Sequence, residues 1–156
     1  MRVGVMAWLC VASDGSSKLM RCDSPMNSRS YIAKVLTPNL SFIRPHTSRR
    51  GQSVLFQQDN ASCHVSKVTK AWLTAHRVKL LEPWPALSPD LNIVEHCWSL
   101  LSKNMVGKSF STADSLWEGI QAAWFAVPAT YVKGLYASYV RRLAAVTVAR
   151  GGPTRY

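Results

Sequence analysis

Long apolar runs are missing from this chain of 156 residues. No stretch reaches the ~20 apolar residues that a membrane-spanning helix needs, so no such span is predicted. Cysteine is scarce as well, with four residues in the chain. Their spacing forms neither a CxxC pair nor a dense framework. A domain of this length does not need disulfides, and we expect free, buried thiols. Glycine and proline, at eight each, are too few for a collagen-like or low-complexity chain.

Acidic residues are also in short supply. Eight Asp and Glu stand against 19 Lys and Arg, which gives a net charge of +11 and a pI near 10.0. An excess of this size favours a polyanionic partner, either nucleic acid or an anionic membrane surface. The plainer alternative is a basic protein without such a partner. Because acids are so few, each one is a candidate for a specific task.

Apolar residues, in contrast, are plentiful, at 47% against 17% charged residues. This composition predicts a folded core, and the length suits one domain better than two. The start of the chain predicts a β-hairpin with strands at 3–11 and 18–22, because Asp14-Gly15 is a strong hairpin turn. A signal peptide is the alternative for residues 1–13, which combine a positive charge with a short apolar run.

Helical spacing of apolar residues predicts five helices, at about 28–40, 62–75, 90–105, 111–127 and 130–148. Ser28 and Ser62 are the expected first caps, and a basic loop is expected at 44–51. Short apolar runs at 54–56 and 78–81 predict buried strands. Because a helix links these two runs, we expect a parallel crossover and an α/β sheet.

Two carboxylates stand where chemistry is expected. Asp59 follows the strand at 54–56, and Glu95 lies on the first turns of the helix that begins near residue 90. Sites in open α/β sheets form beyond the carboxyl ends of strands. Carboxylates bind Mg²⁺, and two ions about 3.5–4 Å apart can drive phosphodiester displacement. On spacing alone, however, an exposed strand-end Asp and a solvated helix Glu are the simpler interpretation.

A weaker alternative is a structural zinc site. Two adjacent pairs, Cys63-His64 and His96-Cys97, supply four residues of the types that bind zinc. Adjacent side chains rarely point the same way, so this hypothesis ranks far behind.

Two long strings decide between these interpretations. QQDNASCHVS at residues 57–66 resembles the second catalytic motif of the Tc/mariner superfamily of transposases, and WPALSPDLNIVEHCW at 84–98 is similar to the third. Shorter matches extend the resemblance over nearly the whole chain, at 5–8, 26–27, 115–124 and 151–156. The match at 5–8 favours the hairpin strand over a signal peptide.

The resemblance implies an α/β, ribonuclease-H-like mixed sheet flanked by helices, with a core at about 1–106 and C-terminal helices at about 111–150. It also implies a DDE mechanism, in which three carboxylates bind two Mg²⁺ or Mn²⁺ ions, cut DNA at a transposon end and join it to a target. By position, Asp59 and Glu95 are the second and third catalytic, metal-binding acids. Asn60 and His64 shape the site. Asp90 or Asn92 can cap the helix that carries Glu95, and the motif favours Asp90.

The first catalytic acid of the resemblance should lie on a strand before Val3. Asp14, the earliest acid, falls at the tip of the predicted hairpin. We therefore expect an N-terminally truncated catalytic domain, without its first central strand and without a DNA-recognition region, that is inactive by itself. The alternative is a remnant that binds nucleic acid and catalyses nothing.

DNA, both transposon ends and target, is the partner that the resemblance implies, in the nucleus. A homodimer is left open, and neither a membrane nor a small-molecule substrate is expected. Five basic residues are candidates for phosphate contacts, although each could equally be solvated. These are Arg44, Arg49, Arg50, Lys67 and Lys70.

Overall fold

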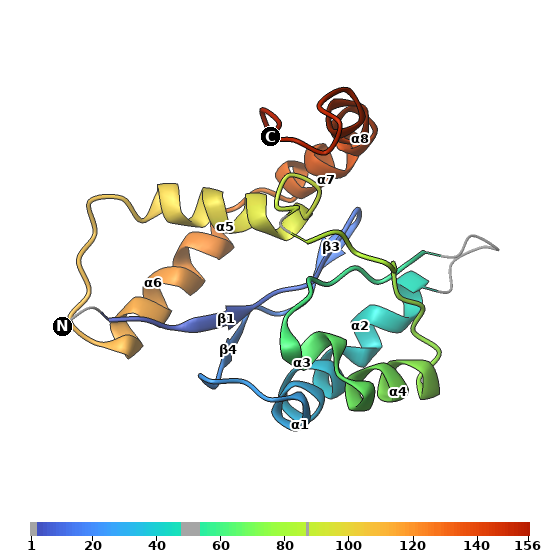
Figure 1. Ribbon diagram of the computed structural model, residues 1–156. Coiled ribbons are helices and arrows are strands. Elements are labelled where there is room, and N and C mark those ends of the chain that lie inside the picture. Colours follow the sequence, from blue (N-terminus) through green and yellow to red (C-terminus); the bar gives the residue numbers. More distant parts are fainter. Residues whose placement is uncertain (1–2, 48–53, 87) are drawn as a thin grey trace. The chain divides into compact units, whose positions relative to one another are not determined.

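The computed structural model describes residues 3–47, 54–86 and 88–156 (Figure 1). The chain forms two compact units. The N-terminal unit comprises Val5–Cys10 and Ser17–Ala86, and the C-terminal unit comprises Met1–Gly4, Val11–Ser16 and Leu87–Tyr156. No helix in the described ranges has both the length and the apolar character to cross a bilayer.

The predicted hairpin is present, but it is interrupted. At its base, β1 (Met6–Trp8) pairs antiparallel with β4 (Met20–Cys22), and at its tip β2 (Val11–Ala12) pairs with β3 (Gly15–Ser16). Between the two pairs, Ser17 Oγ accepts the backbone N–H of Cys10 at 2.9 Å. A side chain that takes a backbone donor competes with the regular ladder, so the strands are shorter than the predicted 3–11 and 18–22.

A long helical segment follows, made of α1 (Ser28–Tyr31), the π-helical turn η1 (Ile32–Leu36) and α2 (Thr37–Thr47). Its cap is Asn27, which accepts the N–H of Ser30 at 2.9 Å, and the expectation of Ser28 was one residue late. The π turn comes just before Pro38, which has no N–H to donate. A wider turn at that point lets the helix continue.

The basic loop predicted at 44–51 is wrong for its first residues. Arg44 and Pro45 lie on α2, which extends to Thr47, and the predicted loop residues Arg49 and Arg50 lie outside the described residues. Pro45 favoured a loop, but the helical segment that begins at Ser28 continues through it to Thr47.

The predicted parallel crossover is confirmed in its smallest form. Phe56 donates its N–H to the carbonyl of Lys79 at 2.8 Å and accepts from Leu81 at 2.9 Å, which forms a parallel bridge to Leu80. Phe56 is buried, whereas Val54 is 44% exposed and was wrongly predicted to be buried. A strand is covered only where neighbours pack on it, and in the described ranges this bridge involves Phe56 alone.

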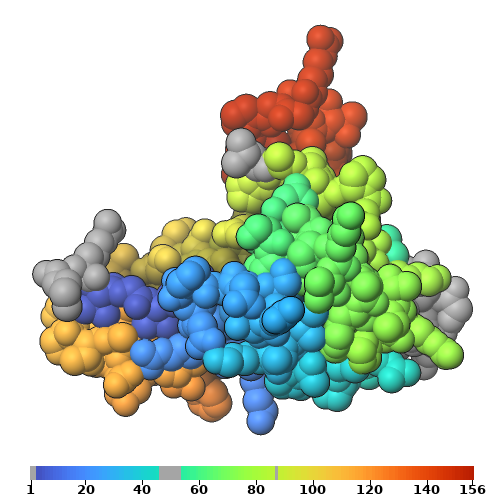
Figure 2. All heavy atoms as spheres, turned by 60° about the horizontal axis from the view of Figure 1, so that its bottom comes forward, coloured from blue at the N-terminus to red at the C-terminus, as the bar shows by residue number. Residues whose placement is uncertain are grey.

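The helix predicted at 62–75 is two helices, α3 (Ser62–Val65) and α4 (Lys67–Ala75). Ser66 between them is extended, with ψ at 148°, and its hydroxyl accepts the N–H of Thr69 at 3.1 Å. Ala61, and not Ser62, occupies the cap position of α3. The break turns Val65 and Val68 outward, at 42% and 56% exposed. In the space-filling view, α3 and α4 (green) lie against α1 (blue) (Figure 2).

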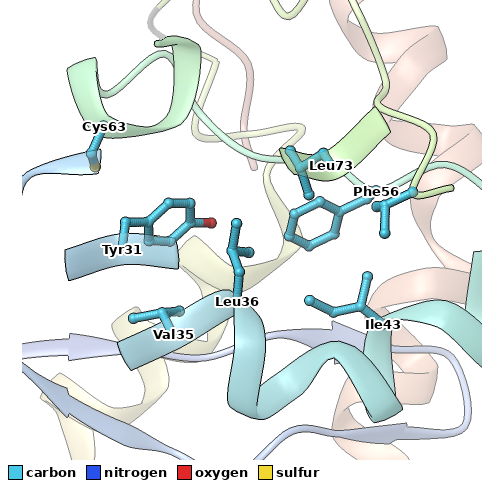
Figure 3. Packing of buried hydrophobic residues seen from close by; sticks show 8 residues of the cluster. Tyr31, Val35, Leu36, Ile43, Phe56, Cys63 and Leu73 are labelled. Carbon is cyan, nitrogen blue, oxygen red and sulfur yellow. The ribbon is translucent and has the colours of Figure 1, made fainter. Parts of the chain in front are cut away.

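The core of the N-terminal unit lies between these helices and the bridge. Its buried residues are Tyr31, Val35, Leu36, Ile43, Phe56, Cys63, Leu73 and Val78. The Phe56 ring lies among Leu36, Ile43 and Leu73 (Figure 3). The core therefore holds the backbone at Phe56, three residues before Asp59.

The C-terminal unit is mainly helical. Its helices are α5 (Ile93–Asn104), α6 (Ala113–Phe125), α7 (Ala129–Ala137) and α8 (Tyr139–Val148). The single helix predicted at 130–148 is divided at Ser138, whose hydroxyl donates to the carbonyl of Leu135 at 2.7 Å. The predicted start near 111–114 is confirmed, because Thr112 and Ser115 form a reciprocal cap of α6.

All four cysteines are free thiols, as predicted. Cys63 and Cys97 are buried, whereas Cys10 and Cys22 are half-buried. Burial raises the pKa of Cys97 to about 11, so this thiol stays protonated and unreactive at neutral pH.

Candidate active site

Asp59 lies in the N-terminal unit, with its side chain 55% exposed. Its Oδ1 accepts the backbone N–H of Ala61 at 3.0 Å and contacts Nδ1 of His64 at 2.7 Å. Both contacts involve Oδ1, and within the described part of the chain Oδ2 has no partner. The carboxylate is thus fixed in direction while one oxygen stays available to a ligand.

His64 is itself held by the core. Its ring lies against Tyr31, with ring centroids 4.5 Å apart. The Tyr31 hydroxyl donates to Oε1 of Gln58 at 3.0 Å, and Nε2 of Gln58 donates to the carbonyl of His64 at 3.2 Å. Burial raises the pKa of Tyr31, which keeps the hydroxyl a donor. A continuous set of contacts therefore runs from the core to Asp59.

His64 was predicted to lie beside the site, whereas Gln58 and Tyr31 were not. Gln58 lies inside the quoted QQDN string, so its position was a usable indication. Tyr31 carried no such indication, because its helical spacing marked it only as a core residue.

Asn60 links two loops. Its Nδ2 donates to the carbonyl of Trp84 at 3.0 Å, which joins the segment after Phe56 to the segment after Leu81. A small hollow, open to solvent, lies here. Its lining residues are Gln58, Asp59, Asn60, Val65, Leu80, Leu81, Glu82 and Trp84.

Only part of the predicted basic set can be placed. Lys70 Nζ lies 2.6 Å from Oε1 of Glu82, an ion pair that sequence analysis did not predict. Both side chains are nearly half exposed, so this pair contributes no more than about 1 kcal/mol to stability. Lys67 and Arg44 are exposed. Phosphate contact by these residues stays a prediction.

Glu95 lies in the C-terminal unit, on the first turn of α5, and is half-buried. The cap position belongs to Asn92, the other candidate, so the preference for Asp90 was wrong. The reason is a tight turn before the helix, in which the N–H groups of Leu91 and Asn92 bond back to the carbonyl of Ser88 at 3.3 and 3.2 Å. The turn delays the helix start to Ile93.

Asp90 instead contacts the C-terminal end of the chain. Its Oδ2 accepts the hydroxyl of Thr154 at 3.0 Å, and its carbonyl accepts Nη1 of Arg142 at 3.1 Å. The same Nη1 contacts Nε2 of His96. Burial, and then the Arg142 charge, lowers the pKa of His96, so the ring is neutral at pH 7 and accepts this bond.

The zinc alternative finds no support. Nε2 of His96 is occupied by a guanidinium donor, and Cys97 is fully buried. Over the ranges that the structure describes, no group of three or more His, Cys, Asp and Glu is arranged to hold a metal.

Oxygen ligands for a hard cation are nonetheless present, because Asp59 offers Oδ2 in a fixed orientation and lines the hollow. The donor chemistry therefore fits Mg²⁺ or Mn²⁺ at Asp59. Glu95 belongs to the other unit, and an ion shared by the two carboxylates stays a prediction.

Comparison with known proteins decides the family. The sequence model of the DDE superfamily endonucleases matches residues 7–117, which include both Asp59 and Glu95. The chain belongs to this family. The Tc/mariner resemblance is confirmed too, because this chain is 37% identical over 153 residues to the Tcb1 transposase of Caenorhabditis briggsae. It is 35% identical over 153 residues to the Tc1 transposase of Caenorhabditis elegans.

Each of these two alignments covers 97% of this chain and 54% of the relative. The chain thus spans about half the length of these relatives.

Solved structures show the fold of this chain. The catalytic domain of Mos1 transposase, determined with raltegravir and Mg, superposes with a TM-score of 0.80 at 19% identity and covers 96% of this chain and 77% of that chain. The Mos1 mariner paired end complex with Mn gives a TM-score of 0.81 at 20% identity, covering 99% and 47%. The predicted ribonuclease-H-like fold is confirmed.

Proposed function

We propose that this chain is the metal-binding part of a DNA transposase, which cuts DNA strands and transfers them to a target. Asp59 and Glu95 are the proposed ligands of Mg²⁺ or Mn²⁺. The observation that carries the proposal is the Asp59 carboxylate, held at Oδ1 with Oδ2 open, inside a matched family segment. Support for the metal comes from Mos1 catalytic domain structures determined with Mg and with Mn.

Bound divalent ions would activate an attacking oxygen and stabilise a leaving oxygen of the phosphodiester. The residues of this chain supply orientation. Ala61 and His64 fix Oδ1 of Asp59, which reduces the rotational freedom that the carboxylate would lose on binding a cation. The buried Tyr31 holds Gln58, and Gln58 in turn holds the backbone of His64.

DNA is the proposed substrate. The net charge of +11 favours a polyanion, and the exposed Lys67 and Arg44 are proposed phosphate contacts. Mos1 has been solved as a paired end complex and as a strand transfer complex, which supports a DNA partner and a second copy of the chain. Because the proposed substrate is DNA, we also propose a nuclear location.

Metal affinity tests the proposal. Mn²⁺ binding to residues 1–156 is measured by titration calorimetry for the wild type, Asp59→Asn and Glu95→Gln. Both variants should bind Mn²⁺ at least about tenfold more weakly, because each loses a charged oxygen ligand. The matched controls are Asp14→Asn, at the exposed hairpin turn, and Glu118→Gln, exposed on α6. Unchanged affinity in both site variants would contradict the proposal.

A second candidate is a DNA-binding remnant without activity. It is favoured by the excess of basic residues. Nicking of duplex DNA with Mn²⁺ separates the two functions. Nicking that Asp59→Asn abolishes supports the enzyme, whereas DNA binding that weakens with salt, without nicking, supports the remnant.

A further inference from the structure

Arg142 on α8 is 5% exposed, which is rare for an arginine. Its Nε donates to the hydroxyl of Ser138 at 2.8 Å, and its Nη1 donates to the carbonyl of Asp90 at 3.1 Å and to His96. The guanidinium also lies over the ring of Tyr156, 4.7 Å from its centroid. Such a buried group adopts one geometry, because its fork of donors must meet these acceptors together.

The C-terminal tail contributes to the same cluster. α8 ends at Val148, and Gly151, with φ at +79°, turns the chain away from the helix. The hydroxyl of Thr154 then donates to Oδ2 of Asp90, and it accepts the N–H of Tyr156 at 3.3 Å. The tail is therefore bonded to a side chain 64 positions earlier in the sequence.

These contacts lie on both sides of Glu95. Before it, Asp90 is held at its carbonyl by Arg142 and at its carboxylate by Thr154. After it, His96 is held at its ring by Arg142 and at its carbonyl by Tyr131, at 3.1 Å. The groups that donate these bonds come from α7, α8 and the tail, and in the sequence Glu95 lies between the two residues that they hold.

We propose that Arg142 and Thr154 are positioning residues for Glu95. They hold the residues that precede and follow Glu95 in the sequence, so that the Glu95 carboxylate is presented in one orientation to a divalent cation. The inference rests on the proposed function, because it assumes that Glu95 is a metal ligand. Residues that orient a metal ligand typically change metal affinity by about 10- to 100-fold when they are substituted.

The test measures Mn²⁺ affinity and the thermal unfolding midpoint of residues 1–156 in parallel. Thr154→Val removes one hydroxyl at nearly constant volume, and Thr154→Ser retains it. Arg142→Lys keeps the charge but loses the planar fork. Lys133→Ala, exposed on α7, is the control for a general loss of positive charge.

We expect Thr154→Val and Arg142→Lys to weaken Mn²⁺ binding by about tenfold or more, and Thr154→Ser and Lys133→Ala to match the wild type. In a Glu95→Gln background, Thr154→Val should have no further effect, because both changes act on the same ligand.

The inference is overturned if Thr154→Val and Arg142→Lys lower the unfolding midpoint yet bind Mn²⁺ like the wild type, because the contacts are then purely structural. It is also overturned if Thr154→Val weakens binding equally in the Glu95→Gln background. If Glu95→Gln alone leaves the affinity unchanged, the proposed function fails at Glu95, and the inference fails with it. If Glu95→Gln weakens Mn²⁺ binding but Thr154→Val and Arg142→Lys do not, the proposed function stands and only the positioning role is refuted.

Discussion

Asp59 and Glu95, one in each unit, are held in opposite ways. The partners of Asp59 are local, since Ala61 and His64 lie two and five residues away. The neighbours of Glu95 are held by remote residues, because Arg142 reaches His96 across 46 positions and Thr154 reaches Asp90 across 64. A short motif can therefore carry the direct partners of Asp59, whereas the contacts around Glu95 depend on the folding of the C-terminal unit.

The largest expected effect is on stability in the C-terminal unit. Arg142→Ala leaves a cavity and three acceptors without their donor, so the free energy of unfolding should fall by about 2–4 kcal/mol. Urea unfolding measures this. Lys133→Ala should change it by less than about 0.5 kcal/mol, and an equal loss in both variants would show that Arg142 acts only through its charge.

Two tyrosines give the next comparison. Tyr31→Phe breaks the bond to Gln58 inside the core and should lower the free energy of unfolding by about 1–2 kcal/mol. Tyr131→Phe breaks the bond to the His96 carbonyl at a half-buried position, where water can replace the hydroxyl, so about half that loss is expected. Urea unfolding measures both losses. A greater loss for Tyr131→Phe would mean that the hydrogen bond in the C-terminal unit contributes more to stability than the one in the N-terminal unit.

The stability lost on removing a helix cap should differ less between the two units. Ser66→Ala and Thr112→Ala each remove a side-chain acceptor at the start of a helix, α4 or α6, at a cost of about 1 kcal/mol. Both hydroxyls also donate to the side chain of the residue that they cap, but Ser66→Ala should cost more because Thr69 is fully buried whereas Ser115 is not. Thermal melts measured by circular dichroism give both values, and equal values would mean that the burial of Thr69 adds nothing to the Ser66–Thr69 contact.

The smallest expected effect is a pH dependence specific to the C-terminal unit. Burial and then Arg142 hold the pKa of His96 below its usual value of about 6.5. The unfolded chain then binds the proton more tightly than the folded one, so stability is complete above pH 6.5 and falls as the pH drops through the folded pKa. Urea unfolding between pH 5 and 7.5 should show this slope, and His96→Gln should reduce it. The same slope in both proteins would assign it to another group.

Features that depend on local chemistry could be predicted from the sequence. Asp14-Gly15 predicted the hairpin turn, and the two apolar runs around a helix predicted the parallel bridge at Phe56. The motif strings predicted the family and placed His64 near Asp59.

Features that depend on a side chain meeting a particular backbone group could not be predicted. Ser66 and Ser138 interrupt helices whose apolar periodicity continues across the break, because each hydroxyl bonds the backbone locally. Arg142 looked like one more basic residue, since every acceptor except Ser138 lies far away in the sequence. The exposure of Val54 likewise depends on which neighbours cover its strand.

The π turn at Ile32–Leu36 has a consequence for insertions and deletions. Because a π turn holds about one residue more than an α turn, removing one residue from it would restore a regular α-helix with nearly the same phase on either side. Removing one residue from α2 just after Pro38 would instead rotate everything after the deletion by about 100° about the helix axis relative to α1. Ile43 would then leave the cluster around Phe56, and the strand end that presents Asp59 would lose its support. In this segment the number of residues, more than their identity, sets the phase between the two halves of the helix.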